Sequence, residues 1–145
     1  MASLIYDSAL YDALTGAIDF GGDAFRVMLV GPGYVPDAAL HARRSDVGDE
    51  AAGRGYEAGG AAVAVGAGRR RGGGTEVSLG GAVWPRAQLS AAGAVYYKAR
   101  GGLASADELV AYIDFGGLVV ATNGDFLLER SVIDLAADSN PEPRP

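Results

Sequence analysis

Apolar and polar residues alternate along the second half of the chain, and the alternation predicts β-strands. Three apolar runs of strand length, rich in Val, Ile, Tyr and Phe, lie at residues 94–99, 109–115 and 126–128. Pairs of turn-forming residues separate them: Gly101-Gly102, Gly116-Gly117 and Asn123-Gly124. Because Gly and Asn accept positive φ at little cost, each pair predicts a reversal of the chain. We therefore predict an antiparallel meander that the rest of the chain covers or extends.

Side chains of a strand point alternately to opposite faces, so the run at residues 109–115 should have one buried face. This core face holds four side chains, which we expect to be buried together with Phe126: Leu109, Ala111, Ile113 and Phe115. The opposite face carries Val110, Tyr112 and Asp114. In the run at residues 94–99, Val95 and Tyr97 share one face, opposite Tyr96 and Lys98. Lys98 is expected to lie in solvent.

The N-terminal half predicts a helix, then a strand with both faces buried, then a short helix. The first helix should have Ser3 as its N-cap, extend to Thr15 and end before Gly16. Its apolar stripe would be Tyr6, Ala9, Leu10, Ala13 and Leu14. The strand is expected at residues 25–30 and the short helix at residues 37–44, with Asp37 as its N-cap. Further strands are predicted at residues 61–66, 75–79 and 132–135.

Two segments have compositions that do not favour packing. Residues 66–74, G-A-G-R-R-R-G-G-G, are predicted to form a mobile hairpin tip, and residues 138–145 a disordered tail. The length of 145 residues suits a single domain, which we place at residues 1–137. The predicted fold is mainly β: a single β-sandwich, jelly-roll-like, with a short N-terminal helix.

The net charge of −6 argues against binding to nucleic acid or to an anionic membrane surface. The chain has no Cys and its single histidine is His41, so we expect neither disulfides nor a structural zinc site, and no cofactor. We expect His41 to lie in solvent on the short helix. The N-terminal residues include Asp7 and no basic region, so no signal peptide is expected.

Residues of catalytic type are few, and we expect no enzymatic activity. The adjacent carboxylates Asp49-Glu50 and Asp107-Glu108 are the candidates for paired acid and base, and both pairs lie in predicted loops. Asp-Phe-Gly occurs twice, beginning at Asp19 and Asp114, without the other motifs of a kinase. In both copies we expect the Phe to pack inward and the Asp to cap the turn.

Six side chains are candidates for contact with a partner. Three are aromatic, since such residues anchor interfaces and stack on sugars: Trp84, Tyr96 and Tyr112. Three are consecutive cations, able to hold a phosphate or an acidic partner: Arg69, Arg70 and Arg71. Burial of Trp84 in the core beside Pro85 and solvation of the arginines are the competing interpretations.

Several motifs together resemble small virion structural proteins of tailed bacteriophages. They are I-D-F-G-G-D-A-F-R-V-M-L-V near the start, and V-W-P-R-A-Q-L-S-A-A-G-A-V-Y-Y-K, L-V-A-Y-I-D-F-G-G and N-G-D-F-L-L in the second half. The similarity covers residues 6–30 and 83–128 but not the middle or the C-terminal tail. It implies a β-rich, non-catalytic component of the virion, either a capsid (head) decoration or a fibre-like attachment. Its partners would be other virion proteins, and it would form a homo-oligomer.

Two alternatives belong to other functional classes. One is a carbohydrate-binding β-sandwich module that uses Trp84 and the tyrosines of the meander. The other is a hydrolytic enzyme that uses one of the carboxylate pairs, which the sequence disfavours.

Overall fold

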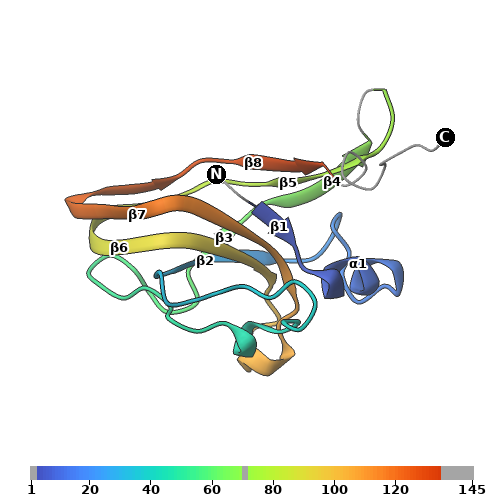
Figure 1. Cartoon of the computed structure of the whole chain (residues 1–145), viewed down its shortest axis with the longest axis horizontal. Coiled ribbons are helices and arrows are strands. Elements are labelled where there is room, and N and C mark those ends of the chain that lie inside the picture. The colour runs from blue at the N-terminus through green and yellow to red at the C-terminus, as the bar shows by residue number, and fades with distance from the viewer. Residues whose placement is uncertain (1–2, 70–71, 135–145) are drawn as a thin grey trace.

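The computed structural model describes residues 3–69 and 72–134, and two antiparallel sheets pack face to face in it (Figure 1). The larger sheet has the order β1 (Ser3–Ile5), β7 (Leu109–Leu128), β6 (Ala82–Lys98), β2 (Phe25–Val30) and β3 (Ala61–Val63). The smaller sheet has the order β4 (Val65–Arg69), β5 (Thr75–Leu79) and β8 (Ser131–Asp134). The helical elements are α1 (Asp7–Leu14), η1 (Arg44–Asp46) and η2 (Ala104–Ala106). The predicted mainly β sandwich with a short N-terminal helix is confirmed.

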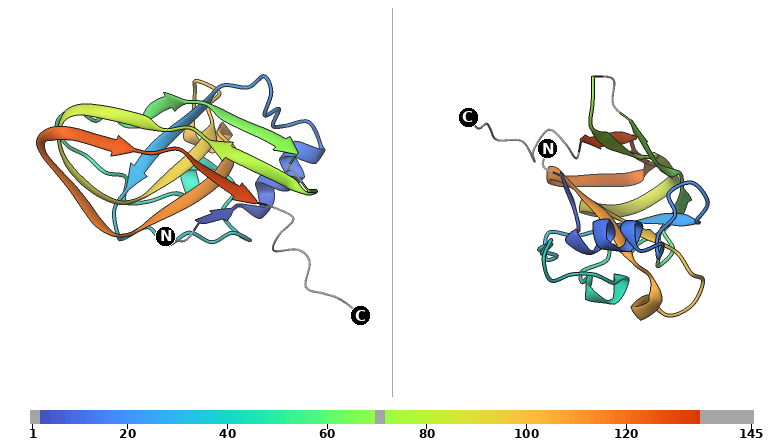
Figure 2. Two further views of the ribbon diagram at one scale, coloured as in Figure 1. Left: turned by 90° about the horizontal axis from the view of Figure 1, so that it is seen from above. Right: turned by 90° about the vertical axis from the view of Figure 1, so that its right-hand side faces the viewer.

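A single long hairpin runs through both sheets. Leu79 of β5 pairs with Ser131 of β8 in the smaller sheet, and Ala82 of β6 pairs with Leu128 of β7 in the larger one. The two long arms therefore fold over together at a corner, which lies at the end of the sandwich away from α1 (Figures 1 and 2). A Cβ atom at Gly81 would lie 2.5 Å from the carbonyl oxygen of Leu128, so the corner requires glycine there.

The predicted meander is wrong at two of its three turns. The chain does reverse at Gly101-Gly102, but it continues through Gly116-Gly117 and Asn123-Gly124 as one strand, β7. Both sites do adopt positive φ, 80° at Gly116 and 53° at Asn123. The β6–β7 register shifts at both, because residues 115–118 lie opposite Ala92 alone and Asn123 is an extra residue between two paired ones. The positive φ therefore makes β-bulges here instead of reversals.

The two Asp-Phe-Gly-Gly segments share a local structure, as predicted. Asp19 Oδ1 accepts a hydrogen bond from the N–H of Gly21 at 2.9 Å, and Asp114 Oδ1 accepts one from Gly116 at 2.9 Å. Phe20 and Phe115 are half-buried and pack against the core. The same tetrapeptide thus forms a loop before β2 and a bulge inside β7.

The core face predicted for residues 109–115 is correct for Ala111, Ile113 and Phe115, which pack in the core between the sheets with Phe126. Leu109 belongs instead to a second cluster on the other side of the larger sheet, whose members are Tyr6, Met28, Val30, Tyr34, Val95, Tyr97, Leu109 and Tyr112. The cause is another bulge: Tyr96 pairs with Ala111 but Tyr97 pairs with Leu109. The extra residue reverses the direction of Leu109.

The first helix is shorter than predicted. It begins after Tyr6, which is its N-cap, and Ser3 lies instead in β1, opposite Ile113 of β7. The helix buries Ala9 and Asp12, whereas Leu14 of the predicted apolar stripe is exposed. Gly16 follows the helix at φ 87°, as expected for a C-terminal glycine.

The helix predicted at residues 37–44 is also wrong. Asp37 Oδ1 accepts hydrogen bonds from the N–H groups of Ala39 and Leu40, both at 3.0 Å, but only a turn forms there and η1 follows. His41 is half-buried, and its Nδ1 lies 2.9 Å from the hydroxyl oxygen of Tyr34. The side chain is therefore held by a partner, whereas the prediction placed it in solvent.

Strands are confirmed at residues 25–30 and 75–79, and the region predicted at 61–66 contains two, β3 and β4. Part of the predicted mobile tip is strand, because residues 66–69 belong to β4 and pair with β5. Arg70, Arg71, Leu135 and the predicted tail lie outside the described residues.

Candidate interaction surface

Trp84 is buried in the core between the sheets, with 4% of its surface exposed. Its ring lies 5.9 Å from that of Tyr56 and 6.1 Å from that of Phe126, which is its cross-strand partner. This position agrees with core burial beside Pro85 and leaves no free indole face for a sugar.

Tyr96 and Tyr112 are buried as well, on opposite sides of the larger sheet. Tyr96 is 0% exposed, and its hydroxyl donates a hydrogen bond to the carbonyl oxygen of Gly80 at 2.7 Å. Burial raises the pKa of Tyr96 to about 12. Tyr112 is 8% exposed and meets the ring of Tyr34 edge-on at 5.9 Å. The structure therefore does not bring the three aromatic candidates together on a surface.

Of the three candidate cations, Arg69 is described. It is exposed at the end of β4, where it pairs with Thr75. Arg70 and Arg71 lie outside the described residues.

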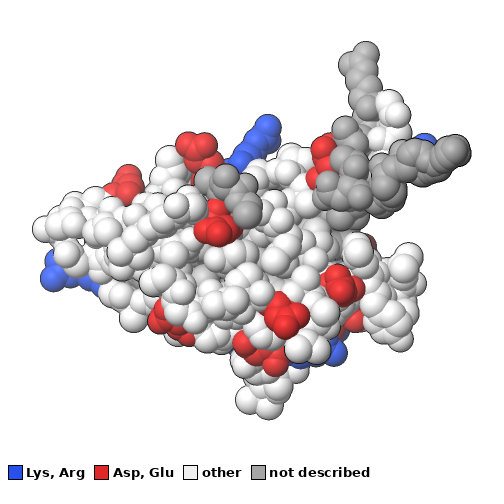
Figure 3. All heavy atoms as spheres, viewed as in Figure 1, with Lys and Arg blue, Asp and Glu red and all other residues white. Residues whose placement is uncertain are grey.

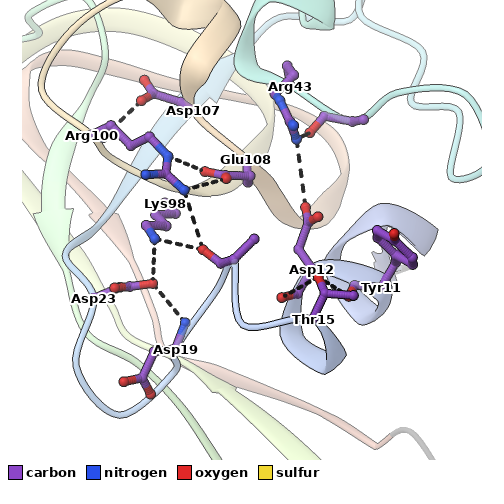
Figure 4. A network of polar contacts seen from close by, with 12 residues as sticks. Tyr11, Asp12, Thr15, Asp19, Asp23, Arg43, Lys98, Arg100, Asp107 and Glu108 are labelled. Carbon is purple, nitrogen blue, oxygen red and sulfur yellow. Dashed lines mark hydrogen bonds and ion pairs between the residues drawn. The ribbon is translucent and has the colours of Figure 1, made fainter.

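The carboxylates Asp107 and Glu108 belong to a network of ion pairs between the β6–β7 connection and the N-terminal elements (Figure 4). Both carboxylate oxygens of Glu108 accept hydrogen bonds from Arg100, at 2.9 and 2.6 Å. Burial opposes the charged form of Glu108, but the bonds from Arg100, a backbone hydrogen bond and the charges of Arg100 and Arg43 together outweigh it and lower its pKa. Asp107 pairs with Arg44 Nε at 2.8 Å.

Two further ion pairs extend this network toward the N-terminus (Figure 4). Lys98, predicted in solvent, pairs with Asp23 at 2.9 Å. Asp12 of α1 lies 3.7 Å from Arg43, and burial raises the pKa of Asp12 although Arg43 opposes the shift. The carboxylates of this region are thus engaged by cations, and they tie segments distant in the sequence to one another.

The second carboxylate pair is engaged too. Asp49 Oδ2 accepts the N–H of Gly33 at 2.7 Å, and Glu50 Oε2 accepts the hydroxyl of Tyr56 at 2.6 Å. Among residues 3–69 and 72–134, no group of three or more His, Asp or Glu side chains could hold a metal ion.

The outer edge of β7 carries three consecutive exposed apolar side chains. Leu118, Val119 and Val120 are 58%, 43% and 61% exposed. Within the described residues β1 covers this edge of β7 only at residues 111–113, so the strand continues past it without a neighbour on that side. Figure 3 shows an almost uncharged surface over the part of β7 distant from α1. We call residues 118–122 with their outer backbone edge the open edge of β7.

An apolar groove lies beside this edge, between β7 and the start of β8. Its volume is about 320 Å³. Apolar side chains line most of it: Ile113, Phe115, Val119, Phe126, Leu127 and Leu128. Glu129 and Arg130 stand at its rim and are exposed. Ile113, Phe126 and Leu128 belong to the core between the sheets and are buried, so the groove lies against the edge of this core.

Sequence reasoning missed this surface because it placed residues 116–124 between two turns. The signal was nevertheless present, since residues 115–124 carry no charged side chain and include two adjacent β-branched residues, Val119-Val120. Such a segment is typical of a strand, and only the pairing partner on its outer side was unknown.

No described helix is long and apolar enough to cross a membrane. No family model matches the chain, and neither a curated protein nor a solved structure matches it.

Proposed function

We propose that this chain is a structural protein of a tailed-bacteriophage virion, either a capsid decoration or a fibre-like attachment, and that it acts by assembly with other proteins. The motifs of residues 6–30 and 83–128 support this through their resemblance to small virion proteins. The observation that carries the proposal is the open edge of β7 with its apolar groove.

The physical argument is that such an edge is unfavourable in a protein that stays alone. An edge strand with unpaired backbone groups and apolar side chains is a template for another strand, and monomers usually block it with charges, Pro or a covering loop. Here residues 118–122 contain none of these charges and no Pro, and Val119 and Val120 are exposed. An assembly partner would remove this apolar surface from water.

The carbohydrate-binding alternative depends on aromatic side chains that a sugar can reach. Trp84, Tyr96 and Tyr112 are at most 8% exposed, so no observation favours this alternative over assembly. It is retained only as an outcome of the test.

The test is quantitative mass spectrometry of phage particles purified by density gradient from an infected culture. We expect the chain to co-purify with the major capsid protein at a fixed ratio, in many copies for a head decoration and in few for a fibre-like attachment. An abundant host cytosolic protein serves as the control for carry-over. If the chain is found in the lysate but not in particles, the proposal fails, and binding on a glycan array would then support the alternative.

A further inference from the structure

We propose that His41 is a pH-sensitive latch, which holds residues 34–41 against the larger sheet and releases them on acidification. The inference goes beyond the proposed virion function and does not depend on it. The latch consists of three side chains joined by hydrogen bonds, Tyr6, Tyr34 and His41, and of the backbone N–H of Asp37. We call residues 34–41 the cover segment.

The cover segment belongs to the connection after β2, which passes over the face of the larger sheet that is turned away from the smaller sheet (Figure 1). Tyr34 is 6% exposed there and packs in the second cluster, with its ring edge-on to that of Tyr112 of β7. A hollow of about 410 Å³ already lies beside the segment, and both tyrosines and the exposed Val35 line it. Outward movement of the cover segment would therefore expose aromatic surface of the second cluster.

The bonds at His41 determine which of its ring nitrogens carries the proton. Nδ1 lies 3.2 Å from the backbone nitrogen of Asp37, and a backbone N–H can only donate. Nδ1 must therefore be the accepting nitrogen of a neutral imidazole, whose proton is on Nε2. The hydroxyl oxygen of Tyr34 lies 2.9 Å from the same Nδ1, so this hydroxyl donates to it as well.

The hydroxyl groups of Tyr34 and Tyr6 continue this chain of hydrogen bonds to the start of α1. Because the Tyr34 proton points to His41, the Tyr34 oxygen accepts a hydrogen bond from Tyr6, at 2.7 Å. Tyr6 is 0% exposed, and burial raises its pKa, so its hydroxyl keeps the proton that it donates. Beside it, the N–H of Asp7 donates to the carbonyl oxygen of Ala38 at 2.9 Å. The cover segment is thus tied to the start of α1 at two points.

A proton on Nδ1 of His41 would break this arrangement. The new N–H would face the N–H of Asp37, two donors without an acceptor between them. Tyr34 would have to turn its proton toward Tyr6, whose own hydroxyl has no other acceptor among the described residues. A buried donor without a partner costs more than an ordinary hydrogen bond contributes. The cover segment avoids these costs by moving away from the sheet, where water supplies the missing partners.

The charged groups around the latch are weaker influences than its direct bonds. The titratable groups near it come from α1 (Tyr6 and Asp7), from the connection after β2 (Tyr34, Asp37, Arg43 and Asp46) and from β7 (Tyr112 and Asp114). The four acids attract a protonated ring, but each is exposed or half-buried, so water screens its charge. The bonds at Nδ1 exist only with the neutral ring. Their stabilisation is therefore complete above the pH at which a histidine ordinarily titrates, about 6.5, and decreases below it.

The first test determines the tautomer of the ring in the wild-type chain. His41 is the only histidine, so its ring signals are assigned without any variant. Long-range correlation of ring protons with ring nitrogens by NMR distinguishes a proton on Nε2 from one on Nδ1. At about pH 7.5, where histidine is mostly neutral, we expect the proton on Nε2. A proton on Nδ1 at this pH would overturn the inference.

The second test follows release of the cover segment by hydrogen exchange of the Asp37 amide. Its protection, measured relative to an unstructured peptide at the same pH, should fall by about 10-fold or more between about pH 7.5 and about pH 5. In His41→Asn the side-chain oxygen replaces Nδ1 as acceptor but does not titrate, so the protection should stay constant. The amide of Val95, which lies in β6 between β2 and β7, is the internal control and should remain protected at both pH values.

Three results of the exchange experiment would overturn the inference: wild-type protection of Asp37 that does not change with pH, an equal fall in His41→Asn, or an equal fall at Val95, which would mean that the whole domain opens. Circular dichroism checks that the variant folds. If it does not fold, the two wild-type measurements remain decisive, because each has its own contradicting result. None of these outcomes depends on whether the chain is found in phage particles, so the latch and the proposed function are tested separately.

Discussion

Two substitutions that remove the same number of carbon atoms can show whether the core is packed less tightly beside the groove than at its centre. Ile113→Ala acts at the wall of the groove, where the side chain is 4% exposed. Leu29→Ala acts at a side chain of β2 that is 0% exposed in the same core between the sheets. Each change removes three carbons, which corresponds to about 2.4 kcal/mol of lost transfer free energy.

The cavity left behind should separate the two variants. The void at Leu29 is enclosed, so lost packing contacts add to the transfer free energy, and we expect a total of about 4 kcal/mol. The void at Ile113 opens into the groove, where neighbouring side chains can move and water can enter, so we expect about 2.5–3 kcal/mol. Both values are decreases in the free energy of unfolding.

The assay is urea unfolding followed by tryptophan fluorescence, since Trp84 is the only Trp and lies in this core. All variants are measured at one low protein concentration, because association would add a concentration-dependent contribution. Val83→Ala, at a side chain 50% exposed, is the control and should change the stability little. The reasoning is refuted if Ile113→Ala costs less than about 1 kcal/mol or costs as much as Leu29→Ala.

Two other predictions concern single polar contacts. Tyr96→Phe removes the buried hydroxyl that donates to Gly80 and should lower the free energy of unfolding by about 1 kcal/mol. The control Tyr11→Phe, at a ring 68% exposed, should have no effect on this free energy. Equal effects of the two substitutions would contradict the role of the bond. Arg100 helps to hold the pKa of Glu108 below its usual value. The pair therefore adds to the stability at pH values above the usual pKa of a glutamate, and this contribution is lost as the pH falls through the pKa of Glu108 in the folded state. Thermal unfolding between pH 6 and about pH 3 should therefore depend less on pH in Glu108→Gln than in the wild type, and an unchanged pH dependence would exclude this contribution.

Local patterns were sufficient to predict the strands themselves. Alternation and β-branched residues located β2 and β5 at their observed bounds, because these signals depend only on neighbouring side chains. The same is true of the positive φ at Gly116 and Asn123, which follows from the residue types. Whether positive φ reverses a strand or makes a bulge depends on the opposite strand, and here the pairing with β6 keeps β7 continuous.

Contacts between distant segments were decided by the tertiary structure. Lys98 has no local signal for burial, and its partner Asp23 lies on the loop before β2. Leu109 changed faces through a single bulge, which counting by twos along one strand cannot detect. The aromatic candidates Trp84 and Tyr96 have residue types that suit either an interface or a core, and only the position of the second sheet buried them.

The open edge of β7 depends on both the local sequence pattern and the tertiary structure. The sequence determines that residues 118–122 are apolar, uncharged and suited to a strand. It does not determine that they are exposed, since the same residues would be buried if another strand lay beside them. Among the described residues β1 covers only residues 111–113 of β7, and the exposure of Leu118, Val119 and Val120 is a property of this arrangement of strands.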